Sequence, residues 1–114
     1  MASHYANYIY EREGKSILED EFGFATYLFT GEHCYIEDIY VASEHRRGRH
    51  ATRYLDEISR IALQNGYSKL LGSVNIKLGD PVSSLYGMCY YGFKPISTEK
   101  NMIYFEKLLK EKVD

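Results

Sequence analysis

Three arginines and a glycine cluster where an apolar segment ends and an amphipathic one begins. The cluster consists of Arg46, Arg47, Gly48 and Arg49, and it follows the apolar run 35–41. The N–H groups in the first turn of a helix have no partners within the helix and lie at the positive end of its dipole, so they bind anions. The pattern therefore predicts a local anion site, with a solvated basic turn as the alternative.

Two adjacent carboxylates precede this turn. On a regular strand Glu37 and Asp38 lie on opposite faces, and Glu37 shares its face with Tyr35, Ile39 and Val41. Apolar neighbours raise the pKa of a carboxyl group, which suits a general base working near neutral pH. Glu37 is therefore the candidate base. The alternative is that one carboxylate pairs with an arginine or ends the sheet.

Apolar periodicity and turn residues predict the elements that position these groups. We expect strands over 5–11, 22–29, 34–41, 69–76, from 93 onward and over 101–109, helices over 49–65 and 82–91, and a charged tail over 110–114. A hairpin turn makes 22–29 antiparallel to 34–41, and the crossing helix makes 34–41 parallel to 69–76. Residues 16–21 fit either a short helix or the start of a strand.

At these residues the chain resembles the GNAT-type N-acetyltransferases. The acyl-CoA signature of that family is Arg/Gln-x-x-Gly-x-Gly/Ala, between a strand that ends in Val-x-Pro and a long helix. Val41, Arg46 and Ala51 fall on the valine, the arginine and the last small residue without a gap. Ser43 stands where proline is usual. Arg49 stands where the central glycine is usual, with the chain's own glycine one residue earlier.

The resemblance implies a fold and a cofactor. The fold is α/β (α+β), with a mixed, mostly antiparallel twisted sheet, a central parallel βαβ unit and two main helices. Its element order matches residues 22–109, and the length predicts one domain over residues 1–114. Acetyl-CoA is the implied co-substrate. The cofactor-binding positions are Ile39, Tyr40, Val41, Arg46, Arg47, Gly48, Arg49, His50, Ala51, Thr52 and Asn75.

Some of these positions have alternative interpretations. The Arg49 side chain either contacts the ligand or turns away from it. His50 either binds the cofactor or packs on the first turn of the helix, and Asn75 either contacts the pantetheine arm or closes a strand.

The family's general acid is a tyrosine four residues before the Gly-Phe that ends the second helix. Here that position is Met88, flanked by Tyr86 and Tyr90. Tyr86 is the candidate acid, with packing of both tyrosines as the alternative. The strand around Asp38 also resembles that of the diamine acetyltransferases, where a Glu-Asp pair serves the amine. This second resemblance implies that Asp38 binds the amine substrate.

Composition excludes several classes of protein. A net charge of −2 argues against a general nucleic-acid binder. No apolar run reaches the roughly 20 residues of a membrane helix, and the N-terminus has no basic or apolar leader, so we expect a cytoplasmic protein. Neither the cysteines, Cys34 and Cys89, nor the histidines have metal-site spacing, so we expect no metal. Twelve tyrosines supply surface for a cleft or a subunit contact.

The combined expectation is an N-acetyltransferase that moves an acetyl group from acetyl-CoA to a primary amine. The acceptor is a protein lysine, a protein N-terminus or a small polyamine-like amine. The N-terminal third is too short for the two helices that usually cover the family's acceptor site, which suggests a protein-sized acceptor or closure by a second subunit in a homodimer. The alternatives are an inactive CoA-binding or protein-interaction module and, least favoured, a nucleic-acid-contacting protein.

Overall fold

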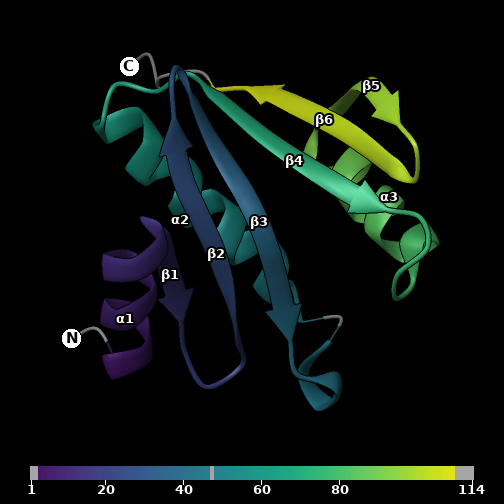
Figure 1. Ribbon diagram of the computed structural model, residues 1–114. Coiled ribbons are helices and arrows are strands. Elements are labelled where there is room, and N and C mark those ends of the chain that lie inside the picture. The colour runs from purple at the N-terminus through teal and green to yellow at the C-terminus, as the bar shows by residue number, and fades with distance from the viewer. Residues whose placement is uncertain (1–2, 47, 110–114) are drawn as a thin grey trace, which may run out of the picture.

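The computed structural model describes residues 3–46 and 48–109, which form three α-helices, one short 3₁₀ helix and six strands (Figure 1). In chain order the elements are α1 (His4–Glu13), β1 (Ser16–Glu19), β2 (Gly23–Thr30), β3 (His33–Val41), η1 (Ser43–His45), α2 (His50–Gln64), β4 (Lys69–Asn75), α3 (Pro81–Tyr91), β5 (Lys94–Glu99) and β6 (Met102–Leu108). Among these residues, no helix is long and apolar enough to cross a membrane.

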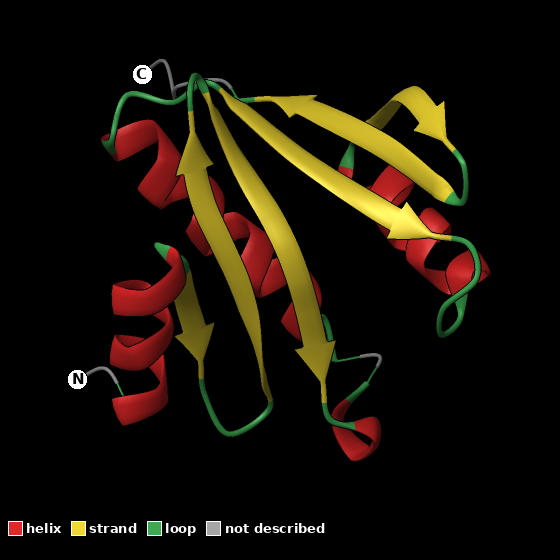
Figure 2. Cartoon of the chain, in the orientation of Figure 1, coloured by secondary structure: helices red, strands yellow, loops and turns green. Residues whose placement is uncertain are grey.

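One twisted sheet contains all six strands, in the order β1-β2-β3-β4-β6-β5 (Figure 2). Neighbouring strands are antiparallel except β3 and β4, which are parallel and are connected through α2. In the view of Figure 1, α2 lies behind β2 and β3, and α3 lies behind β4 and β6. The predicted mixed sheet with a central parallel βαβ unit is therefore confirmed.

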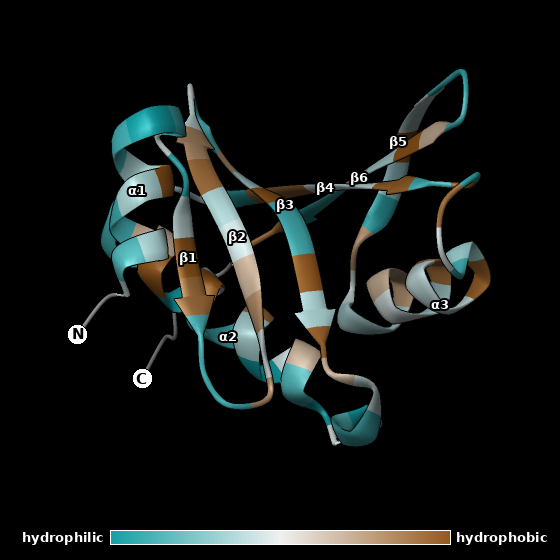
Figure 3. Cartoon of the chain, turned by 60° about the horizontal axis from the view of Figure 1, so that its bottom comes forward, coloured by the Kyte–Doolittle hydropathy of each residue, from teal (hydrophilic) through white to brown (hydrophobic). Residues whose placement is uncertain are grey.

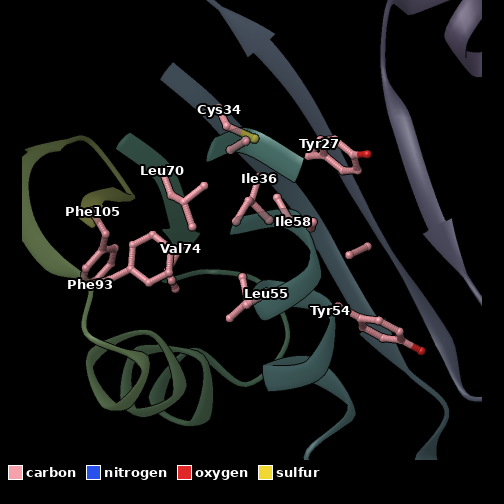
Figure 4. Packing of buried hydrophobic residues seen from close by; sticks show 12 residues of the cluster. Tyr27, Cys34, Ile36, Tyr54, Leu55, Ile58, Leu70, Val74, Phe93 and Phe105 are labelled. Carbon is pink, nitrogen blue, oxygen red and sulfur yellow. The ribbon is translucent and has the colours of Figure 1, made fainter. Parts of the chain in front are cut away.

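The hydrophobic core lies between α2 and the inner face of the sheet (Figure 4). The largest side chains that are fully buried are Phe105, Ile58, Leu70 and Cys34. Burial raises the pKa of the Cys34 thiol to about 12, so this thiol stays protonated and packs as a small apolar group.

The N-terminal segment differs from the sequence prediction. Residues 5–11 were expected to form a strand, but they belong to helix α1. Ser3 caps this helix by accepting a hydrogen bond from the backbone N–H of Ala6 at 3.0 Å, and Gly14 ends it with φ 71°. Ala6 and Ile9 are buried at helical spacing. These end signals outweigh the β preference of the tyrosines, and the alternating tyrosine pattern was therefore misleading.

The other elements agree closely with the sequence. Residues 16–19 form a strand, which settles the open choice at 16–21. Asp80 caps α3 through the backbone N–H of Ser83, and Pro81 is its first residue, one position before the predicted start. The predicted tail 110–114 lies outside the described residues.

We predict that Leu70→Ala lowers the free energy of unfolding by about 2–5 kcal/mol, because it leaves a cavity in a fully buried site. Leu78→Ala is the matched control, since Leu78 is 67% exposed, and its effect should stay within about 0.5 kcal/mol. Urea unfolding of the two variants and the wild type measures both effects. Equal losses in the two variants would contradict this description of the core.

Candidate active site

Strands β3 and β4 separate soon after they meet. Their parallel ladder contains only two residue pairs, Cys34 with Leu70 and Tyr35 with Leu71. Beyond these pairs the two strands diverge, as Figure 1 shows. The facing backbone edges of residues 36–41 and 72–75 therefore have no strand partner across the gap, and their N–H and C=O groups can bind a ligand that enters between the strands.

A β-bulge lies in the part of β3 that borders this gap. Tyr27 pairs with Ile36 and Thr26 pairs with Asp38, so Glu37 is an extra residue. Ile36 is buried in the core, and Ile39 packs against the same core although it lies three positions further on. The bulge therefore shifts the alternation of side chains by one residue. A hydrophilic band interrupts β3 between hydrophobic ones (Figure 3).

The predicted environment of Glu37 is wrong for this reason. Glu37 does not share the apolar face of Ile39 and Val41. It is exposed, and its Oε1 accepts a hydrogen bond from Lys15 Nζ at 2.7 Å. This hydrogen bond raises the pKa of Lys15. Lys15 lies 22 residues away in the sequence, and no motif indicated the contact.

Asp38 is the freer of the two carboxylates. Its side chain is exposed and has no hydrogen-bond or ion-pair partner among residues 3–46 and 48–109. Its backbone N–H donates to Thr26 Oγ1 at 3.1 Å, which holds the strand just after the bulge. Asp38 can therefore meet a cation without first giving up a partner.

The candidate acids lie on the outer face of α3. Tyr86 is 75% exposed and Tyr90 is 90% exposed, so the alternative that both tyrosines pack is wrong. Met88, which takes the place of the family's tyrosine, packs against the core. A different tyrosine is the packed one: Tyr91 donates to Asp56 Oδ1 at 2.7 Å and ties α3 to α2. Burial, followed by this hydrogen bond, raises the pKa of Tyr91 to about 12.

The arginine-rich turn leads into a helix without a side-chain cap. Ser3 caps α1 and Asp80 caps α3, but within residues 3–46 and 48–109 no side chain caps the first turn of α2. The N-cap residue is Arg49, with φ 63° and ψ 21°. This left-handed conformation favours glycine, which explains why the family motif has glycine at this position. The first-turn N–H groups of α2 remain available to an anion.

The arginines of the turn are placed differently from one another. Arg46 Nε donates to the backbone carbonyl of Val41 at 2.9 Å, and its guanidinium lies 5.8 Å from the centre of the Tyr40 ring. Arg46 therefore braces the end of β3 as well as supplying charge. Arg47 lies outside the described residues. The Arg49 side chain is exposed at the start of α2.

A polar cluster joins the β1–β2 turn to α2. Asp20 accepts hydrogen bonds from the Tyr54 hydroxyl at 2.6 Å, from the backbone N–H of Phe22 at 2.9 Å and from Arg53 at 2.7 Å. Burial alone would raise the pKa of Asp20, but these three donors outweigh it and lower the pKa well below its usual range. Burial, followed by the hydrogen bond to Asp20, raises the pKa of Tyr54 to about 12. No sequence motif indicated this cluster, because Asp20 lies more than 30 residues from Arg53 and Tyr54.

Asn75 ends β4 and is already engaged. Its side-chain Oδ1 accepts a hydrogen bond from the backbone N–H of Lys77 at 2.9 Å, which fits the alternative that it closes a strand. Among residues 3–46 and 48–109, no group of three or more His, Cys, Asp or Glu side chains is placed to hold a metal ion.

A groove of about 520 Å³ lies over β4, β5 and β6, beside the last residue pair that joins β3 to β4. Tyr35, Leu71, Ile96 and Tyr104 are among the residues that line it. Leu70, Gly72 and Val74 are buried towards the helices, so Leu71 lies on the opposite face of β4. The Tyr35 hydroxyl is 2.7 Å from Ser73 Oγ and links the two strands at the start of the gap. The groove thus lies on the face of the sheet away from α2, next to the point where the two strands separate.

A family model decides the classification of the chain. The model of the acetyltransferase (GNAT) family matches residues 3–83, which is more than half of the sequence. The chain belongs to the GNAT acetyltransferase family. The suspected resemblance is confirmed, and the match includes the separating strands and the uncapped turn before α2. No curated protein sequence matches the chain.

Solved structures of GNAT proteins share this fold at low sequence identity. PaiA N-acetyltransferase from Thermoplasma acidophilum, solved with coenzyme A, has a TM-score of 0.70 at 17% identity, over 76% of this chain and 53% of its own. Ard1 from Thermoplasma volcanium has a TM-score of 0.69 at 14% identity, over 79% of this chain and 64% of its own. A GNAT acetyltransferase from Elizabethkingia anophelis with acetyl-CoA bound has a TM-score of 0.71 at 17% identity, over 94% of this chain and 84% of its own. The chain thus spans about half to two thirds of the two Thermoplasma proteins.

The lowered pKa of Asp20 predicts a pH-dependent contribution to stability. An unfolded aspartate has a pKa of about 3.9, so the contribution of the folded carboxylate is complete well above that pH and is lost as the pH falls through the lower folded value. We expect Asp20→Asn to lower the free energy of unfolding by on the order of 1–2 kcal/mol near pH 7. The deficit relative to the wild type should shrink below about pH 4.

Urea unfolding of both proteins across this pH range measures the deficit. Asp38→Asn is the control, because the Asp38 side chain has no partner among the described residues, and it should unfold like the wild type near pH 7. A deficit for Asp20→Asn that stays constant down to about pH 3 would contradict the prediction.

Proposed function

We propose that the protein transfers an acetyl group from acetyl-CoA to a primary amine. The observation that carries the proposal is the combination of the gap between β3 and β4 with an uncapped helix start at the end of β3. The gap supplies unpaired backbone groups for an amide-containing arm and a thioester carbonyl. The helix start supplies N–H groups for a phosphate. Family membership and the CoA-bound relatives support this assignment.

The cofactor is held by the backbone and the loop in this proposal. Residues 46–52 receive the pyrophosphate, with first-turn N–H groups and the Arg49 side chain. The free edge of β3 at Ile39, Tyr40 and Val41 receives the pantetheine arm and the thioester, with Asn75 across the gap. Acetyl-CoA supplies an activated acyl group, and the chain supplies position and charge.

The chemical step needs a base, a cation site and a proton donor. The neutral amine attacks the thioester carbonyl, a C–N bond forms, the C–S bond breaks, and the thiolate leaves as a thiol after it takes a proton. Glu37 accepts the amine proton, directly or through water, and must exchange its contact with Lys15 to do so. Asp38 attracts the protonated amine. Tyr86 returns a proton to the leaving thiolate.

The acceptor is a cationic amine on a protein lysine, a protein N-terminus or a polyamine-like molecule. The exposed carboxylates on β3 favour a cation. The groove opens on the face away from α2, which suits a bulky acceptor or closure by a second copy of the chain. In this proposal residues 1–114 act as one domain.

A second candidate is a GNAT-fold module that binds CoA without turnover. Three observations favour it: Glu37 is paired with Lys15, Met88 replaces the family's tyrosine, and the flanking tyrosines are largely exposed. Binding and turnover must therefore be measured separately.

We predict that Arg49→Gln weakens the binding of CoA by about three- to tenfold, because it removes one charge beside the phosphates. Arg60→Gln is the matched control: it removes the same charge from the same helix, 11 positions further along, where solvent and salt screen it from the loop. Calorimetric titration at two salt concentrations measures both variants. The salt dependence should fall for Arg49→Gln alone, and equal behaviour of the two variants would argue against an anion site at the loop.

Turnover separates the enzyme from the binding module. If the protein is an acetyltransferase, we expect Glu37→Gln to lower kcat at least tenfold while CoA affinity stays unchanged, since an amide cannot accept the amine proton. Tyr86→Phe should lower kcat, and Tyr90→Phe serves as its matched control one turn away. Thiol release from acetyl-CoA with a panel of amines is the assay. Tight CoA binding by the wild type without thiol release for any amine would favour the module.

A further inference from the structure

The ring of His50 lies beside Gly48 in the turn before α2, and one hydrogen bond indicates which ring nitrogen carries the proton. Its Nδ1 is 3.0 Å from an NH2 group of Arg53. Arginine has only donors, so Nδ1 must accept this hydrogen bond. A neutral imidazole carries one proton, and with Nδ1 as acceptor that proton is on Nε2. His50 therefore presents an N–H donor at the far end of its ring.

The partner that sets this tautomer is itself held in place. Arg53 bonds to Asp20 Oδ2 at 2.7 Å, and the Tyr54 hydroxyl bonds to Asp20 Oδ1 at 2.6 Å. The lowered pKa of Asp20 keeps its carboxylate charged, and the hydrogen bond from Arg53 to it raises the pKa of Arg53. The β1–β2 turn thus contributes a charge pair to the first turn of α2, and this pair orients His50.

Packing fixes the ring so that Nε2 lies at the loop. The imidazole stacks on Phe22, with ring centres 4.1 Å apart and planes 17° apart, and its edge lies beside Gly48. A Cβ atom on residue 48 would lie 3.0 Å from His50 Nε2. Among residues 3–46 and 48–109, Nε2 has no hydrogen-bond partner. A donor is therefore held next to the turn that the proposed function assigns to the pyrophosphate.

We propose that His50 binds a phosphate oxygen of coenzyme A through Nε2–H, and that Asp20 and Arg53 are a positioning pair for it. This inference rests on the proposed function, because it names a further ligand residue for the same cofactor. The position of the ring also bears on the glycine in this chain, because a Cβ atom on residue 48 would crowd the His50 ring. The β1–β2 turn becomes part of the cofactor site.

Two substitutions of His50 separate a ligand role from a packing role. Glutamine places an N–H donor near the position of Nε2 but no acceptor near Nδ1, whereas asparagine places an acceptor near Nδ1 but no donor near Nε2. We expect His50→Asn to weaken CoA binding about tenfold or more and His50→Gln to retain most of it. If His50 only anchors Arg53, the order is reversed, and that result would overturn the inference.

The positioning role is tested by a double-mutant cycle. Arg53→Met should weaken CoA binding several-fold in the wild type and add little in the His50→Asn background, because the donor it orients is already absent. Additive losses would show that Arg53 acts independently of His50. Arg60→Met is the matched control on the same helix. Thermal unfolding of each variant shows whether the fold is retained.

The tautomer can be measured without any ligand. Long-range ¹H–¹⁵N correlation spectra of the full chain distinguish Nε2–H from Nδ1–H, and we expect Nε2–H for His50. Finding Nδ1–H would overturn the inference whatever the binding data. If the wild type binds neither CoA nor 3′,5′-ADP, the proposed function fails and the inference fails with it. If it binds both and His50→Asn binds equally well, the inference alone fails.

Discussion

The structure depends on a parallel ladder that stops after two residue pairs. Polar backbone groups that lose a strand partner must meet water or a ligand, because leaving them buried without a hydrogen bond costs free energy. The inner faces of the separating strands still need an apolar partner, and α2 supplies it with Leu55 and Ile58. The helix thus fills the space beneath the separating strands on one face of the sheet. Much of the cofactor half of the site follows from this one arrangement.

The loop at the end of β3 shows how the family motif tolerates unusual residues. A left-handed N-cap is needed to turn the chain into α2, and an arginine adopts it here at a cost of roughly 1–2 kcal/mol. Phe22, Arg53 and Asp20 surround the start of the helix and hold this geometry. The displaced glycine then has a separate reason, which is the space taken by the ring of His50. Arg49 and Gly48 therefore depart from the motif for different physical reasons.

Much of the fold could be predicted from the sequence because its signals are local. The apolar period of α2, the Asp-Pro start of α3 and the hairpin turn between β2 and β3 all lie within a few residues of the elements they define. Two local features led to wrong predictions. The alternating tyrosines suggested a strand where α1 forms, and the assumption of regular alternation along β3 missed the bulge at Glu37. The Lys15–Glu37 and Asp20–Arg53 pairs could not be predicted, because they join segments more than 20 residues apart.

The two halves of the site differ in how they are built, and this bears on what the protein can do. The proposed cofactor half combines backbone groups, which are present whenever β3, β4 and α2 keep their geometry, with the side chains of Arg49 and His50 at the start of α2. The catalytic half relies on individual side chains. Glu37 already has a cationic partner, Lys15. The family's tyrosine is replaced by Met88, and the neighbouring tyrosines are exposed. In the proposed function, affinity for the cofactor and rate of transfer can therefore vary independently, because they depend on different groups of the chain.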